Sequence, residues 1–183
     1  MIFPIGDTPN PRSFVAWVNL SLIALIIAIY VLATLPLSFM APDLGDPAVQ
    51  EWLRQLTLRN PMVDPQALVG VVTQWDLVVH RLGFRSGAPS AVSLFASMFM
   101  HSGFAHVAGN MLFLWIYGDN IEHRLGRLGY LAFWLGSGVA ATLGYSLLAG
   151  ATDVPMIGAS GAISGVLGAY FLLFPRNKVR LLI

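Results

Sequence analysis

The longest run without charge constrains this chain most. From Phe14 to Phe39 there is no Asp, Glu, Lys or Arg. A helix of that length is long enough to cross the ~30 Å hydrocarbon core of a bilayer. It is also too long for the core of a secretory signal, which has roughly 7–15 residues. The sequence therefore predicts a retained membrane anchor at residues 14–39.

Three further apolar runs predict three more spanning helices, at residues 104–121, 128–148 and 156–174. The composition agrees, because 56% of the residues are hydrophobic and only 10% are charged, whereas soluble domains are about a quarter charged. We therefore expect an all-α membrane protein, a helix bundle with four spanning helices in one domain over residues 1–183.

A long polar stretch separates the first two runs. Residues 40–103 carry charges and prolines and are expected to form an outer loop. Within it, Val49–Leu58 and Ala67–Leu82 are amphipathic and too short to span, which is typical of helices lying at the membrane interface.

Basic residues fall on one side of the membrane if the four helices alternate in direction. The positive-inside tendency makes that side cytoplasmic. The sequence thus predicts a multi-pass integral protein of a bacterial plasma membrane with a cytoplasmic N-terminus. The basic residues on this side are Arg12, Arg124, Arg127, Arg176, Lys178 and Arg180.

Composition excludes several classes of function. A net charge of +1 gives no electrostatic reason to expect nucleic-acid binding. The absence of cysteine excludes disulfides, thiolate zinc sites and a cysteine nucleophile. No H-E-x-x-H pattern occurs around His101 and His106, so neither a metal nor another cofactor is expected.

One polar cluster lies at the start of the second spanning run. His106 and Asn110 are four residues apart and share one helical face, and His101 lies just before them. Polar groups inside a bilayer are expensive, so they need a reason. Both side chains can donate hydrogen bonds. The alternative is a hydrogen bond that only joins two helices.

A second cluster, Gly158-Ala159-Ser160-Gly161, opens the fourth run. The flanking glycines leave the hydroxyl of Ser160 uncrowded. The free N–H groups of a helix start favour negative charge, so they would stabilise an oxyanion there. The alternative is that these small residues only allow close helix packing.

Together the two clusters form a coherent acyl-transfer site near the outer face of the membrane. A serine needs a base, because its free hydroxyl is a poor nucleophile. The sequence indicates no obvious base. His123 falls on the other membrane side, His80 lies in the outer loop, and His106 is better placed as a donor.

The order and spacing of these motifs resemble the rhomboid family of intramembrane serine proteases. The matching residues are His101, His106 and Asn110, then Glu122 and Arg124 of an E-x-R motif, then Gly158, Ser160 and Gly161. The resemblance covers about residues 90–175.

The resemblance implies a six-helix bundle that cleaves transmembrane protein substrates in the lipid bilayer. Ser160 would be the nucleophile, with His106 and Asn110 in the oxyanion hole. His101 would support the loop or a water-filled cavity, Gly158 and Gly161 would flank the serine, and Glu122 and Arg124 would be structural.

Two features depart from the family pattern. The family's base is a histidine on its sixth helix, so that residue is expected beyond Ile183. The 183-residue segment would then be incomplete and inactive alone. Ser164 also stands where the family often has an aromatic residue that stacks on that histidine.

Two other functions remain as alternatives. One is a non-catalytic rhomboid-like protein that binds or chaperones transmembrane clients, although such relatives usually lose the serine or the histidine. The other is a fragment of a transporter or channel, for which broken helices near mid-membrane would be expected.

Overall fold

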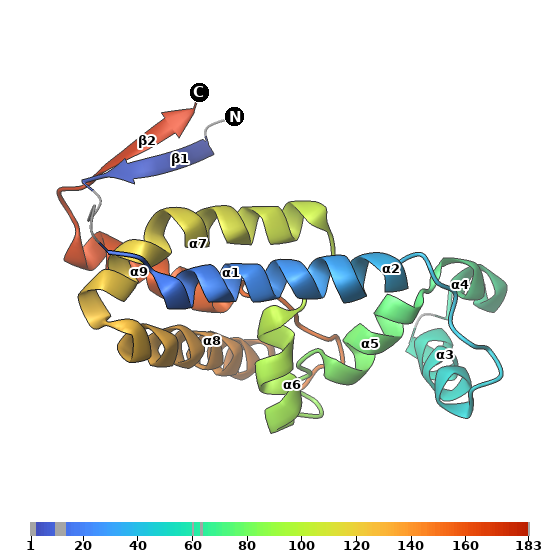
Figure 1. The fold of residues 1–183 in the computed structure, drawn as a ribbon. Helices are drawn as coiled ribbons and strands as arrows, with labels where there is room; N and C mark the ends of the chain where they lie inside the picture. The colour runs from blue at the N-terminus through green and yellow to red at the C-terminus, as the bar shows by residue number, and fades with distance from the viewer. Residues whose placement is uncertain (1–2, 10–13, 60, 63, 183) are drawn as a thin grey trace.

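The computed structural model describes residues 3–9, 14–59, 61–62 and 64–182 (Figure 1). Apart from one two-stranded sheet, the regular elements in these ranges are helices. Arg12, predicted to lie on the cytoplasmic side, is outside the described residues.

Four apolar segments form the body of the molecule. The first comprises α1 (Trp17–Ile29), a π-helical turn (Tyr30–Thr34) and α2 (Leu35–Leu37), and the others are α7 (Phe104–Leu125), α8 (Arg127–Ala149) and α9 (Ser160–Leu173). In Figure 1 α1, α7, α8 and α9 run side by side with alternating direction. Their shared core is centred on large, fully buried side chains, which include Ile26, Tyr130, Trp134 and Tyr170.

The helix lengths give fewer spans than the sequence predicts. In the described ranges, Trp17–Leu37 and Arg127–Ala149 are long and apolar enough to cross a membrane. A third span results if Ala91–Phe99 and Phe104–Leu125, which are bent by 86°, count as one. The apolar α9 has 14 residues and is shorter. The molecule is an integral membrane protein, but its four predicted spans are not confirmed.

The fourth helix begins at Ser160 rather than at residue 156. The backbone of Met156 instead forms an antiparallel bridge with Phe84, with N···O distances of 3.0 and 2.8 Å. These bonds to a distant part of the chain fix the backbone at Met156, and α9 begins only after the turn at Gly158.

The outer loop is largely helical. It contains α3 (Pro47–Arg59), α4 (Pro65–Val71), α5 (Gln74–Leu82) and α6 (Ala91–Ala96), the last followed by a 3-10 turn (Ser97–Phe99). The predicted helix at 67–82 is divided in two. The first piece, α4, ends at Val71, and Thr73 caps α5 through a capping box with Asp76.

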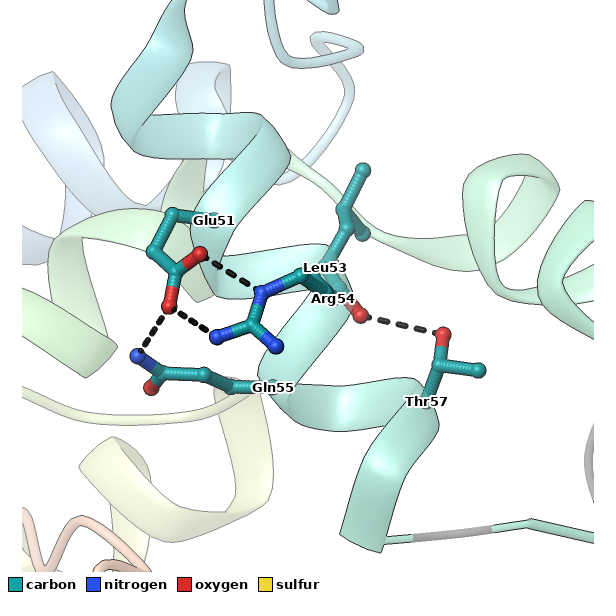
Figure 2. A network of polar contacts seen from close by, with 5 residues as sticks. All are labelled: Glu51, Leu53, Arg54, Gln55 and Thr57. Carbon is teal, nitrogen blue, oxygen red and sulfur yellow. Dashed lines mark hydrogen bonds and ion pairs between the residues drawn. The ribbon is translucent and has the colours of Figure 1, made fainter.

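One face of α3 is polar and exposed. Figure 2 shows Arg54 paired with Glu51 at 2.8 Å, and Gln55 donating to the same carboxylate at 2.9 Å. Farther along the helix, the hydroxyl of Thr57 donates to the carbonyl of Leu53. These exposed groups are typical of a helix that turns one side to water.

The outer helices hold the segment that leads into α9. Arg59 on α3 pairs with Asp153 at 2.6 Å. The backbone N–H of Gly87 donates to the carbonyl of Thr152 at 2.8 Å. The position of Ser160 therefore depends partly on the 40–103 region.

The sheet joins the two ends of the chain. β1 (Phe3–Thr8) pairs antiparallel with β2 (Lys178–Leu182), beyond the end of α9 (Figure 1). Asp7 of β1 is buried and accepts hydrogen bonds from the Tyr170 hydroxyl at 2.7 Å and the Asn120 amide at 3.0 Å. This carboxylate fastens β1 to both α7 and α9.

Small residues bring α8 and α9 together. A Cβ at Gly161 would lie 2.7 Å from the Cβ of Ala141, and one at Gly165 would collide with Ser137. Gly136 and Gly144 have open space where a side chain would be. The close approach of α9 therefore occurs at Ser137 and Ala141 of α8.

Candidate active site

Ser160 is the first residue of α9, and its side chain is exposed. The turn before it depends on Gly158, whose φ of +122° is a conformation that residues with a Cβ rarely adopt. The Gly158 N–H donates to the carbonyl of Ser97 at 2.8 Å. The serine hydroxyl thus lies at a helix N-terminus, where the first N–H groups lack intrahelical partners.

The imidazole of His106 lies beside this serine. A Cβ placed on Gly158 would be 2.7 Å from Nε2 of His106 and 3.8 Å from Oγ of Ser160. The two groups therefore flank one point in space, although they come from α7 and α9. This proximity is what an attack on a carbonyl held between them requires.

His101 supports the same turn from behind. Its side chain is 1% exposed, and its Nε2 accepts a hydrogen bond from the Ala159 N–H at 3.4 Å. Its ring meets that of His106 edge-on, with centroids 4.9 Å apart. These contacts join His101 to the turn before α9 and to the ring of His106.

Asn110 lies one turn after His106 on α7 and is buried. Its Nδ2 has no hydrogen-bond partner among the described residues. An unpaired buried amide is costly, so this donor calls for a partner that the described residues do not supply.

A small cavity of about 90 Å³ adjoins Ser160. Its lining includes Thr142 of α8 and Gly161 of α9. The volume is enough for a few water molecules, at about 30 Å³ each. Ser164, one turn along α9, donates to the carbonyl of Ser160 at 2.8 Å, so its hydroxyl is directed to its own helix.

The E-x-R residues lie away from the serine. Glu122 is fully buried and accepts hydrogen bonds from the backbone N–H groups of Val18 and Asn19. It therefore joins α7 to the start of α1. Arg124 is exposed, and none of the ion pairs found within the described ranges includes it.

The other histidines are engaged elsewhere. His80 stacks on Trp52, and His123 meets Phe14 edge-on. Neither of these two histidines contacts Ser160. In the part of the chain that the structure describes, no group of three His, Cys, Asp or Glu residues is arranged to hold a metal ion.

One polar contact near the site was not foreseen from the sequence. Oγ of Ser102 lies 3.2 Å from Nδ1 of His106. The sequence signal is the spacing, because Ser102 precedes His106 by four residues.

Comparison with known proteins decides the family. Residues 88–183 match the Rhomboid domain, which is more than half of the chain. The chain belongs to the rhomboid family. This family includes serine proteases that act on transmembrane substrates within the bilayer.

Individual rhomboid relatives match about half of the chain. "Rhomboid protein 1, mitochondrial" of Saccharomyces cerevisiae is 38% identical over 98 residues, which are 51% of this chain and 28% of the relative. "Putative rhomboid protease YdcA" of Bacillus subtilis is 31% identical over 87 residues, 47% and 43% of the two chains. The bovine "Presenilin-associated rhomboid-like protein, mitochondrial" is 34% identical over 88 residues, 47% and 23%.

The chain thus spans less than half the length of each of these rhomboid relatives. No solved structure matches it.

Proposed function

We propose that this rhomboid is an intramembrane serine endopeptidase that cleaves transmembrane protein substrates. The observation that carries the proposal is that the Ser160 hydroxyl and the His106 imidazole flank one point at the start of α9. The motif order around them and the names of protease relatives support the same conclusion.

In this proposal Oγ of Ser160 attacks the scissile carbonyl. The negative charge on the carbonyl oxygen is stabilised by the Ser160 backbone N–H, the imidazole of His106 and the amide of Asn110. The unpaired buried Nδ2 of Asn110 supports this role. Such donors are already in position before the substrate arrives, so they need no reorganisation during the reaction.

The general base is proposed to be a histidine outside the described residues, because the chain spans less than half the length of the rhomboid relatives that it matches. None of the described histidines except His106 lies beside Ser160, and His106 serves as a donor. The domain would then have six core helices. A Ser-His dyad supplies the base that a serine needs.

The membrane orientation is proposed from the basic residues. The ends of α7 and α9, the start of α8 and the β1–β2 sheet lie at one end of the bundle (Figure 1). Positive charges favour the inner side of the membrane, so this end of the bundle would face inward. Ser160, at the opposite end of α9, would then face outward. The predicted bacterial plasma membrane has no support from the relatives, two of which carry mitochondrial names.

A cleavage assay tests the proposal. The full-length protein is reconstituted in liposomes with a reporter that contains one transmembrane segment and small residues near its outer end. Ser160→Ala should lower cleavage by at least about 10³-fold. Ser164→Ala, one turn along the same helix, should keep most of the activity. Equal cleavage by wild type and Ser160→Ala would refute the proposed nucleophile.

A non-catalytic, client-binding rhomboid is the second candidate. The observation that favours it is the lack of a base beside Ser160 within the described residues. It predicts that wild type retains the reporter on the protein without cleaving it. Ser160→Ala would then bind the reporter equally well.

A further inference from the structure

The two ring nitrogens of His106 have different neighbours. Nε2 is directed at the Gly158 turn beside Ser160, as the 2.7 Å approach to the Gly158 Cβ position shows. Nδ1 lies 3.2 Å from the hydroxyl oxygen of Ser102, in the turn before α7. Ser102 therefore contacts the imidazole on the side away from the site.

This contact bears on where the imidazole carries its proton. A neutral histidine has one N–H donor and one acceptor nitrogen, and the partner of one nitrogen determines the state of the other. If the Ser102 hydroxyl donates to Nδ1, the proton lies on Nε2, where it can be donated to an oxyanion. The opposite tautomer would turn a lone pair toward the oxyanion and would repel it.

The surroundings favour the first arrangement. Ser102 is exposed, so its oxygen can accept from water while its hydrogen is given to Nδ1. His101, the other polar ring in contact with His106, already uses its Nε2 to accept from Ala159. Its contact with His106 is an edge-on ring contact. Ser102 is thus the described group placed to fix the tautomer of His106.

We infer that Ser102 is a positioning residue that holds His106 in the Nε2–H tautomer needed for the oxyanion hole. The inference rests on the proposed protease function. Ser102 does not touch the reacting atoms and acts only through His106. Losing the partner that orients a metal-ligating histidine typically costs about 10- to 100-fold, and we expect a loss at the lower end of that range for Ser102.

Kinetics of the full-length protein give the first test. Ser102→Ala should lower kcat about tenfold with little change in KM, because the lost interaction matters in the transition state. Ser102→Thr keeps the hydroxyl and should restore kcat to within about twofold of wild type. Ser146→Ala is the matched control, since its hydroxyl donates only to the Thr142 carbonyl of its own helix. It should leave kcat unchanged.

Histidine ¹⁵N NMR gives a second readout that does not need activity. The His106 signals are assigned by their loss in His106→Gln. Wild type and Ser102→Thr should show a protonated Nε2 and a bare Nδ1, and Ser102→Ala should show a mixture of tautomers. A merely structural role for Ser102 would not change this ratio.

The two readouts separate this inference from the protease proposal. If wild type cleaves but Ser102→Ala matches it in kcat and in its ¹⁵N spectrum, the role of Ser102 is refuted and the protease stands. If wild type shows no Ser160-dependent cleavage, the protease proposal fails. The tautomer shift in Ser102→Ala would still show that Ser102 sets the state of His106, and its absence would overturn that claim.

Discussion

Glu122, near the end of α7, accepts a hydrogen bond from the backbone N–H of Asn19, with a distance of 2.7 Å between Oε2 and N. Oε1 accepts from the N–H of Val18 at 3.1 Å. The residue at the N-cap of α1, Ala16, has no side chain able to do this. A carboxylate from another helix therefore caps the start of α1, where negative charge is favoured.

Truncating this cap should destabilise the bundle. Glu122→Ala leaves two backbone N–H groups without their partner, each worth about 1–3 kcal/mol when buried. We expect a loss of about 2 kcal/mol or more in the free energy of unfolding, measured by tryptophan fluorescence in mixed micelles. Glu51→Ala, on the exposed face of α3 (Figure 2), is the control and should show no measurable loss. Equal stabilities of the two variants would contradict the capping role.

Removing the carboxylate of Asp7 should loosen the β1–β2 end of the molecule. Asp7→Ala leaves the Tyr170 hydroxyl and the Asn120 amide without their acceptor. Each unsatisfied buried group lowers the free energy of unfolding by about 1–3 kcal/mol. Protease cleavage near the N-terminus should become faster, because β1 loses its attachment to the helices. Asp7→Asn retains an acceptor oxygen and should be affected less. Unchanged cleavage rates in Asp7→Ala would show that β1 is held by other contacts.

Adding one methyl group at Gly158 should disable the site without unfolding the protein. Gly158→Ala combines an unfavourable φ of +122° with a contact of 2.7 Å to Nε2 of His106. The new methyl group would push the imidazole of His106 out of position, and a displacement of about 1 Å should lower cleavage by about 10²-fold. Gly168→Ala, in α9, has no atom within 4 Å of its new Cβ and should remain active. Full activity of Gly158→Ala would mean that His106 does not need its present position.

The packing of the outer helices should weaken in acid because of His80. Burial, followed by the positive charges of Arg85 and Arg59, lowers the pKa of His80 below its ordinary value of 6.5. Between the two pKa values, His80 is protonated in the unfolded chain but stays neutral in the folded protein, so protonation favours unfolding. Stability from this group is complete above about pH 6.5 and is lost as the pH falls toward the lower folded pKa.

Limited proteolysis of the 40–82 region at pH 8 and pH 5.5 measures this effect. Cleavage of the wild type should be faster at the lower pH. His80→Gln cannot titrate, so its cleavage should change less between the two conditions. An equal acid response in both proteins would assign the pH dependence to another group.

The sequence predicts best what depends on local pattern. The apolar runs at residues 104–121 and 128–148 predict α7 and α8 close to their observed bounds, because apolar length and polar turns define these helices. His106 and Asn110 share a helical face in α7 as their spacing predicts.

Features that depend on distant partners were missed. The start of α9 at Ser160 reflects the pairing of Met156 with Phe84, and no local signal in the sequence encodes that pairing. The β1–β2 sheet joins segments from opposite ends of the chain. The backbone partners of Glu122 lie in α1 and have no side-chain signature, so the sequence could indicate a structural residue but not what it caps.

Covalent labelling of Ser160 tests the central claim most directly. The full-length protein in detergent is treated with a fluorophosphonate probe, and the modified residue is identified by mass spectrometry. We expect an adduct on Ser160, none in Ser160→Ala, and labelling about 10²- to 10³-fold slower when His106 or Asn110 is replaced by Ala. Labelling that persists in Ser160→Ala, or an adduct on a different residue of the wild type, would contradict the account.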